Sequence, residues 1–161
     1  MRMVPALDAG PIVLQSRTPI ADDETYGELQ GRLSEMGALA LIEALTLLEI
    51  GRATEHPQDD SLASYARKVD RETTRIDWSL DAREVANSVQ AYDPSPGSWT
   101  THRGTDVKLF GARRAFDVTG RPGEVLAVDP GGMVVACGAG AVRICDVQPS
   151  GKRRMQSAEW H

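Results

Sequence analysis

The sequence predicts an α/β segment followed by a small β-barrel. A helical repeat of apolar residues fills roughly residues 25–50, a polar stretch follows it, and the apolar period then changes to that of short strands. The 161 residues suffice for one ordinary domain or two small ones. With 41% hydrophobic and 25% charged residues, the composition is that of a globular protein rather than a disordered one.

The N-terminal part combines one candidate strand with one long helix. Residues 12–20 have strand composition, and Pro19 ends that run. Thr25 and Glu28 match a capping box, and Gly51 supplies the helix stop. The apolar face of the helix needs a sheet or a second helix to cover it, so we expect that part of its domain is missing from these residues. That face is formed by residues at spacings of three and four: Leu29, Leu33, Met36, Ala40, Ala44 and Leu47.

The remainder reads as a linker, a short helix and four strands. Residues 52–63 are polar, and Asp81 with Glu84 forms a second capping pair that opens a helix to about Tyr92. Two prolines and a glycine in 93–97 end this helix. The strand candidates are 106–112, 124–128, 133–137 and 141–147, with the last turn centred near Ala139. We expect Trp78 and Trp99 to anchor the core of this part.

Charge, cysteines and hydropathy limit the class of protein. The net charge is −5, but residues 1–99 carry 9 Lys/Arg against 17 Asp/Glu, whereas residues 100–161 carry 9 against 6. A basic C-terminal third favours a nucleic-acid-binding face, and a solvated surface explains the count equally well. Two cysteines and three histidines without ligand spacing predict no metal site and reduced thiols. No segment is typical of a membrane span or a signal peptide, so we expect a cytoplasmic protein without membrane contact.

Few residues are candidates for chemistry, and common nucleotide-binding and hydrolase motifs are absent. Asp8, before the Gly10-Pro11 turn, suits proton transfer if its surroundings are partly apolar, but an Asp there more often only bonds the loop. The basic clusters suit phosphate contacts, and a solvated strand edge is the competing interpretation. They are Arg113 and Arg114 at a strand end, Lys152, Arg153 and Arg154 after the last strand, and Arg67 and Lys68 in the linker.

Five motifs in order resemble those of methionyl-tRNA formyltransferases. They are L-D-A-G-P-I at 7–12, S-Y-A-R-K-V at 64–69, R-I-D-W-S at 75–79, A-Y-D-P-S-P-G-S-W-T at 91–100 and V-Q-P-S-G-K at 147–152. The first and third are shared with related formyltransferases, whereas the last, followed by Arg153-Arg154, favours the tRNA enzyme. Asp93 and Ser95 depart from the family's usual Asn and Trp, and Asp93 is still able to accept backbone N–H bonds in this turn.

The resemblance implies a remnant of a Rossmann-like formyltransferase domain at 1–52, a linker at 53–72 and a barrel similar to the OB fold at 73–161. It implies transfer of a formyl group from 10-formyltetrahydrofolate to the amino group of initiator methionyl-tRNA, by a monomer without metal. Asp8 matches the family's catalytic Asp, and the basic clusters are the expected tRNA contacts. The family's Asn-x-His pair and main folate contacts precede that Asp, so we expect a truncated chain that is inactive alone.

Two alternatives remain open from the sequence. The first is a non-catalytic RNA-binding module in which only the barrel has a role. The second is a fragment of a related sugar-nucleotide formyltransferase.

Overall fold

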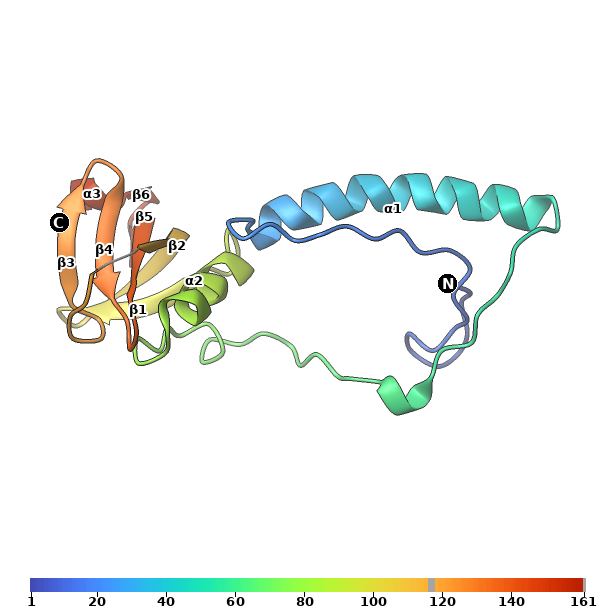
Figure 1. Cartoon of the computed structure of the whole chain (residues 1–161), viewed down its shortest axis with the longest axis horizontal. Helices are drawn as coiled ribbons and strands as arrows, with labels where there is room; N and C mark the ends of the chain where they lie inside the picture. Colours follow the sequence, from blue (N-terminus) through green and yellow to red (C-terminus); the bar gives the residue numbers. More distant parts are fainter. Residues whose placement is uncertain (116–117, 161) are drawn as a thin grey trace. The chain divides into compact units, whose positions relative to one another are not determined.

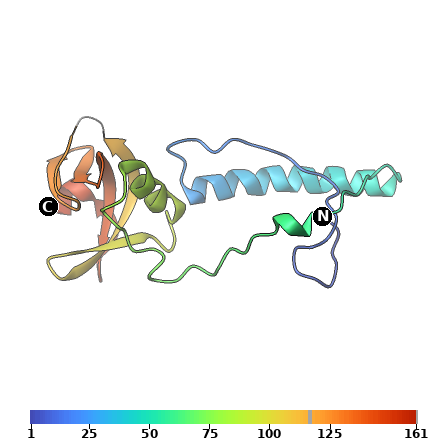
Figure 2. The same ribbon diagram turned by 60° about the horizontal axis from the view of Figure 1, so that its bottom comes forward.

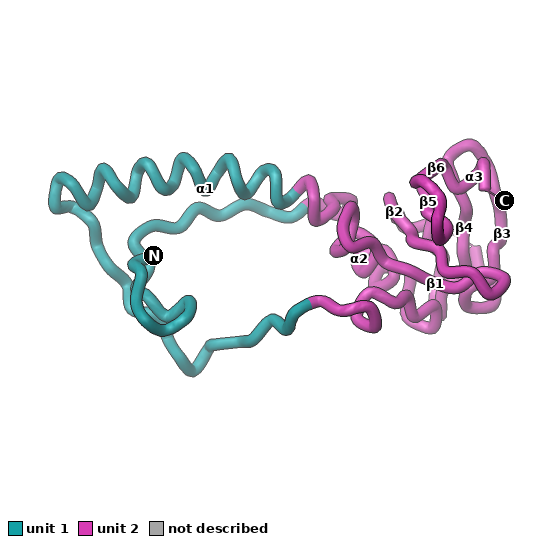
Figure 3. The backbone as a smooth tube through the Cα atoms, turned by 180° about the vertical axis from the view of Figure 1, so that it is seen from behind, with its two compact units in different colours: residues 1–20, 29–68 teal, residues 21–28, 69–161 magenta. Residues whose placement is uncertain are grey.

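The computed structural model describes residues 1–115 and 118–160 (Figure 1). The chain forms two compact units: unit 1 comprises Met1–Ile20 and Leu29–Lys68, and unit 2 comprises Ala21–Glu28 and Val69–His161 (Figure 3). None of the helices in the described part of the chain is long and apolar enough to cross a membrane.

The predicted long helix is confirmed as α1, Tyr26–Glu49. The capping box is present, because the Thr25 N–H donates to Glu28 Oε2 at 2.9 Å and the Glu28 N–H donates to Thr25 Oγ1 at 3.3 Å. The pKa of Glu28 is lowered because its carboxylate accepts hydrogen bonds from the Thr25 backbone N–H and, second, from the Thr25 hydroxyl. No side chain of α1 is buried, and Leu39 is 70% exposed. The predicted apolar face of α1 is only partly covered by the described residues: five of its six members are half-buried, and Leu33 is exposed.

The strand predicted over residues 12–20 is wrong. Its only ladder contact is an isolated bridge in which Ile12 and His56 exchange backbone hydrogen bonds of 2.8 and 2.9 Å. An extended run becomes a strand only where a neighbouring chain accepts its hydrogen bonds, and the described residues provide no such neighbour beyond His56. The polar stretch after α1 contains a single short 3-10 helix, η1 (Asp60–Leu62), capped by Asp59.

Unit 2 is built on an antiparallel six-stranded sheet with the order β1-β2-β5-β4-β3, and β6 pairs with β5. All four predicted strands are confirmed, whereas β1 was missed because it directly follows the Pro/Gly turn. The strands are β1 (Ser98–His102), β2 (Thr105–Ala115), β3 (Val125–Asp129), β4 (Gly132–Ala136), β5 (Ala141–Pro149) and β6 (Met155–Gln156).

Strand β5 lies at the centre of the sheet. Along one edge it pairs with β2, as in Ala112 opposite Ile144. Along its other edge, β5 pairs with β4 as far as Ile144 and with β6 from Asp146 onward. The predicted turn near Ala139 is correct, and across it Met133 faces Ile144. Cys137 and Cys145 are free thiols, as predicted.

Helix α2 (Ala82–Ala91) packs against β2 and closes the core (Figure 2). Its capping box is formed by Asp81 and Glu84, as predicted. Val85 and Val89 are 1% and 0% exposed and belong to the same apolar cluster as Ile144. The short helix α3 (Ser157–Trp160) is fixed by Ser157 Oγ, which donates to the Ile144 carbonyl at 2.6 Å and accepts from the Met133 N–H at 2.9 Å.

The sheet does not close into the predicted barrel. Strands β1 and β3 form the two ends of the strand order and do not pair with each other. The edge of β1 is occupied by the segment before α2, because the Ile76 N–H donates to the Trp99 carbonyl and the Trp99 N–H donates to the Thr74 carbonyl, both at 2.9 Å. Trp99 is buried and Trp78 packs against the core cluster, so both anchor the core as predicted.

The stability of unit 2 depends on the cluster around β5. Ile144 is fully buried in that cluster, so we expect Ile144→Ala to lower the free energy of unfolding by about 2–5 kcal/mol, from lost burial and a residual cavity. Urea unfolding of the full chain, followed by circular dichroism, measures this change. Leu62→Ala, at a side chain that is 80% exposed, is the control and should change the value by less than about 0.5 kcal/mol. Equal effects would contradict the assignment of the core.

Candidate nucleic-acid interface

Two arginines lie opposite each other on the side of the sheet that carries Arg113. Arg113 is exposed on β2 and its Cα partner on β5 is Arg143, a residue that the sequence analysis did not select. Arg143 Nη1 lies 2.5 Å from Asp129 Oδ1, and this hydrogen bond is the main cause of the lowered pKa of Asp129. The charge of Arg143 is thus balanced within the sheet, whereas Arg113 is exposed beside it.

Arg154 has a structural role in addition to its charge. Its Nη1 donates to Asp93 Oδ1 at 3.0 Å, its Nε donates to Asp146 Oδ2 at 2.9 Å, and its guanidinium lies 4.3 Å from the centre of the Phe110 ring. The Asp93 side chain is only 7% exposed, and its Oδ2 accepts the Gly111 N–H at 2.9 Å. The expected backbone hydrogen bond of Asp93 therefore exists, but it reaches β2 rather than the turn itself. Because two carboxylates balance Arg154, it adds little net positive charge to this face.

Lys152 and Arg153 are the unpaired cations of the region. Both are exposed on the turn between β5 and β6, and neither forms an ion pair with a carboxylate of the described residues. The Lys152 N–H donates to the Pro149 carbonyl at 2.9 Å, and Gln148 Nε2 donates to the Lys152 carbonyl at 3.1 Å. The backbone of this turn is therefore fixed while its two charges face solvent, which suits contacts to phosphate.

A second basic group lies around Trp99 and was missed by the sequence analysis. The guanidinium carbons of Arg71 and Arg75 lie 4.1 and 5.4 Å from the centre of the Trp99 ring, and Arg71 also pairs with Asp106 at 2.5 Å. Lys108 donates to the Pro96 carbonyl at 2.6 Å. No local motif predicts this group, because it forms only when residues 71–75 pack beside β1.

A groove of about 510 Å³ connects this group with the Lys152 turn. Its walls come from residues 69–71 and 148–151, and Trp99 and Lys108 lie along it. The groove thus joins the start of unit 2 to the turn that carries the unpaired cations. Its lining contains two cations, Arg71 and Lys108, and two carboxylates, Asp70 and Asp106, so the positive charge of this region comes mainly from the Lys152 turn at one end of the groove.

The remaining predicted phosphate contacts are dispersed. Arg114 Nη2 lies 3.9 Å from Asp22 Oδ2, a weak and exposed pair. Arg67 and Lys68 are exposed at the end of unit 1, directly before unit 2 begins. The structure therefore brings Arg113 close to Arg154, and it leaves the linker cations outside unit 2.

Asp8 lies in a loop that is closed on itself. Gly10 allows this closure, because a Cβ there would lie 1.8 Å from the Arg2 carbonyl oxygen. Gln58 Nε2 donates to the carbonyls of Asp8 and Gly10 at 2.8 and 2.7 Å, and Asp8 has a positive φ of 55°. The expected partly apolar surroundings are not found, since Asp8 is exposed and the neighbouring Leu7 is 92% exposed.

Other chemistry finds little support in the described residues. Burial raises the pKa of Cys137 to about 11 and also raises that of Cys145, so both are poor nucleophiles at neutral pH. Within residues 1–115 and 118–160, no three His, Cys, Asp or Glu side chains are grouped to hold a metal ion. The exposed cations of the Lys152 turn and the groove beside Trp99 are therefore the main candidate features for binding among the described residues.

Comparison with known proteins assigns the family. The family described as "Formyl transferase, C-terminal domain" matches residues 68–161, so the chain belongs to the formyltransferase family. It is 39% identical to "Methionyl-tRNA formyltransferase" of Nitrosospira multiformis over 99% of this chain and 52% of that protein. It is 40% identical to the protein of the same name from Jannaschia sp., over 99% of this chain and 51% of that one. The chain thus spans about half the length of these curated relatives.

Solved structures agree with this family. HypX from Aquifex aeolicus in complex with tetrahydrofolic acid is 26% identical, with a TM-score of 0.78 over 98% of this chain and 28% of that one. WlaRD, a sugar 3N-formyl transferase, has a TM-score of 0.70 over 94% of this chain and 54% of that one. At 16% identity, the likeness to WlaRD shows the fold alone.

The Asp93 carboxylate gives a test of this site. We expect Asp93→Ala to lower the free energy of unfolding by about 1–3 kcal/mol, because it removes the acceptor of both Gly111 and Arg154. Asp93→Asn keeps one hydrogen-bond acceptor at this position, so it should lower the free energy of unfolding by less. Urea unfolding of the full chain measures both values, with exposed Glu35→Ala as the control. If Asp93→Ala is as stable as the wild type, the hydrogen bonds of this carboxylate do not stabilise the fold.

Proposed function

We propose that the chain is the C-terminal part of a methionyl-tRNA formyltransferase and that unit 2 binds the initiator methionyl-tRNA. The observation that carries this proposal is the identity of about 39% to methionyl-tRNA formyltransferases over 99% of the chain. The whole enzyme would transfer a formyl group from 10-formyltetrahydrofolate to the methionine amino group, in the cytoplasm and without a metal. The relative that holds tetrahydrofolic acid, HypX, supports folate as the co-substrate class.

The proposed catalytic part is incomplete in these residues. The apolar face of α1, on which no side chain is fully buried, supports the proposal that residues 1–52 belong to a larger Rossmann-like domain, since such a face is normally covered. Asp8 is proposed as a proton-transfer residue, and its exposed position is compatible with that role only once further residues surround it. The only Asn of the chain, Asn87, lies on α2, so the Asn-x-His pair implied by the resemblance is not present.

The proposed RNA-binding part is the basic side of unit 2. The unpaired cations Lys152 and Arg153, together with Arg113, are proposed as the main phosphate contacts, with Arg114, Arg154, Arg67 and Lys68 as secondary ones. The groove beside Trp99 supports adding Arg71 and Lys108. We propose that the open sheet is related to the OB fold, which is itself a partly open barrel that binds nucleic acids.

Binding of tRNA should depend steeply on salt. We expect the full chain to bind methionyl-tRNA more weakly as salt rises from about 50 to 200 mM, because each neutralised phosphate of a duplex contributes a slope of about −0.9 in log–log form. The double variant Lys152→Ala/Arg153→Ala should reduce the slope by about 2. Fluorescence anisotropy measures the affinity, and Arg83→Ala/Arg121→Ala, two exposed cations elsewhere in unit 2, is the matched control. Salt-independent binding would contradict the proposal.

Formyl transfer is expected to be absent from the 161-residue chain by itself. The resemblance implies that the Asn and His of the Asn-x-His pair stabilise the oxyanion, and this pair is missing from the chain. A single oxyanion donor is worth about 2.7–4 kcal/mol of transition-state stabilisation. Formation of formyl-methionyl-tRNA from 10-formyltetrahydrofolate is the assay, with the Nitrosospira relative as the positive control. Turnover equal to that of the relative would overturn the expectation. Binding of tRNA without turnover separates this proposal from a sugar-nucleotide formyltransferase fragment, which would bind a sugar nucleotide instead.

A further inference from the structure

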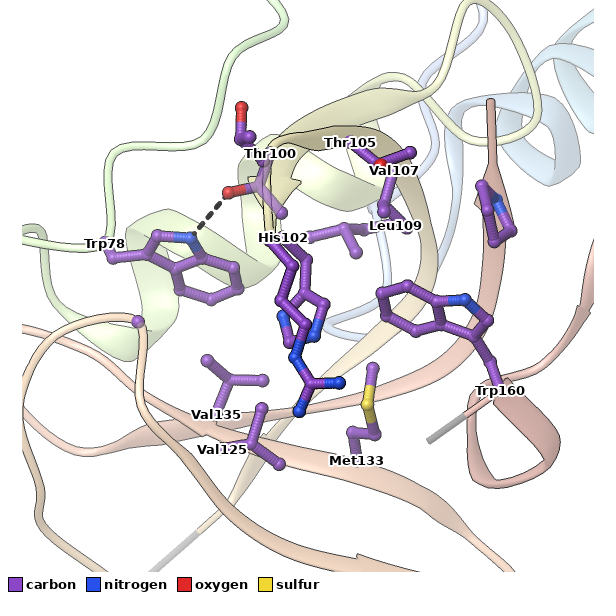
Figure 4. Close-up of a pocket in the computed structure, with 14 residues that line it drawn as sticks. Trp78, Thr100, His102, Thr105, Val107, Leu109, Val125, Met133, Val135 and Trp160 are labelled. Atoms are coloured by element: carbon purple, nitrogen blue, oxygen red, sulfur yellow. Dashed lines mark hydrogen bonds between the residues drawn. The ribbon is translucent and has the colours of Figure 1, made fainter. Parts of the chain in front are cut away.

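The sheet of unit 2 holds a pocket of about 380 Å³ on the side opposite the cations described above. Trp78 and Trp160 appear on opposite sides of it, with His102 between them and Met133 below (Figure 4). Every lining residue belongs to unit 2. The pocket is therefore a feature of one compact unit.

The pocket follows from the open sheet. The interior of a small closed barrel is normally filled by side chains, but here β1 and β3 stay apart. Val107, Leu109 and Val135 are buried in the core and form apolar lining, whereas Trp78 and Trp160 are only partly buried. This size, with mostly apolar and aromatic walls and a few polar groups, is typical of a ligand site.

The aromatic side chains are held in place. Trp78 Nε1 donates to Thr100 Oγ1 at 3.0 Å, which fixes the orientation of that indole. His102 and Trp160 contact edge to face, with ring centroids 5.0 Å apart and an interplanar angle of 68°. Rigid aromatic surfaces bind flat rings at low entropic cost, so the pocket suits a planar ligand.

The charge of the pocket is of one sign. Among the described lining residues there is no Asp or Glu, whereas Arg103 and His102 both lie there. Arg103 is in the turn between β1 and β2 at a φ of 48°, and it forms no ion pair with a carboxylate of the described residues. On a chain with a net charge of −5, the positive charge of Arg103 in this pocket favours an anion.

A planar ring joined to an anion is the chemistry of a nucleotide. We propose that this pocket binds one unpaired nucleotide of an RNA, with its base against Trp78 and Trp160 and its phosphate near Arg103. This inference rests on the RNA binding proposed above. Proteins read RNA sequence mainly at unpaired bases stacked on aromatic side chains, whereas phosphate contacts such as those of Lys152 carry no sequence information. The pocket would thus add base contact to a phosphate-binding domain.

The experiment compares three forms of one RNA hairpin: blunt-ended, with a single unpaired 3′ adenosine, and with an abasic residue at that position. Anisotropy gives the affinity of the full chain for each, and AMP competes in a fourth arm. The unpaired base should improve affinity about 5- to 100-fold over the abasic form, as one stacked base does. Trp160→Ala and Arg103→Asn should each abolish or reduce the ratio of the affinity for the unpaired-base hairpin to that for the abasic hairpin. Both should leave the affinity for the blunt hairpin unchanged. Asn is chosen at position 103 because it tolerates the positive φ found there. Arg83→Ala is the matched control.

The outcomes separate the two proposals. Salt-dependent binding of the blunt hairpin with a base-to-abasic ratio of one overturns the pocket inference and leaves the proposed function standing. Absence of binding to every hairpin overturns both. If AMP binds as tightly as the hairpin with the unpaired base, the RNA assignment is overturned and the pocket is a site for a free nucleotide. A ratio that persists in both Trp160→Ala and Arg103→Asn places the base elsewhere and overturns the inference as well.

Discussion

The buried carboxylate of Asp93 is the interaction on which the basic side of unit 2 depends. It joins three elements that are distant in sequence: the turn after α2, the middle of β2 through Gly111, and the β5–β6 connection through Arg154. A buried carboxylate without hydrogen-bond partners is costly, so the bonds to Gly111 and Arg154 hold these elements together. The position of Arg154 over Phe110, and hence the path of the Lys152 turn, follows from this pairing.

The two sides of the sheet carry different groups of residues, although burial does not alternate strictly: every residue of β4 is buried, as are the neighbours Leu109 and Phe110 on β2. One side carries the apolar cluster around Ile144 and the pocket, and the other carries the cations that face solvent. Phosphate contacts would give RNA affinity on the second side, while base contact would give selectivity on the first. Substitutions on the cationic side should therefore change the affinity for RNA, and substitutions on the pocket side should change the selectivity for an unpaired base.

Local signals in the sequence predicted much of the fold. Both capping boxes, the long helix, four strands and the two core tryptophans could be assigned because each depends on residues close in the chain. The strand at 12–20 and the closed barrel were wrong because pairing depends on distant partners: His56 alone meets Ile12, and residues 74–76 occupy the edge of β1. The Arg71–Trp99 contact and the buried state of Asp93 were not predictable for the same reason. The clusters Arg113–Arg114 and Lys152–Arg154 were found because their members are adjacent in sequence.

An open sheet has two edges, and each is a template for pairing with another chain. The edge of β1 is already hydrogen-bonded to residues 74–76. Strand β3 has an irregular register between Val125 and Ala127 and ends at the charged Asp129. Bulges and charges at an edge disfavour intermolecular sheet formation. The unclosed sheet of unit 2 is thus protected against aggregation at both edges.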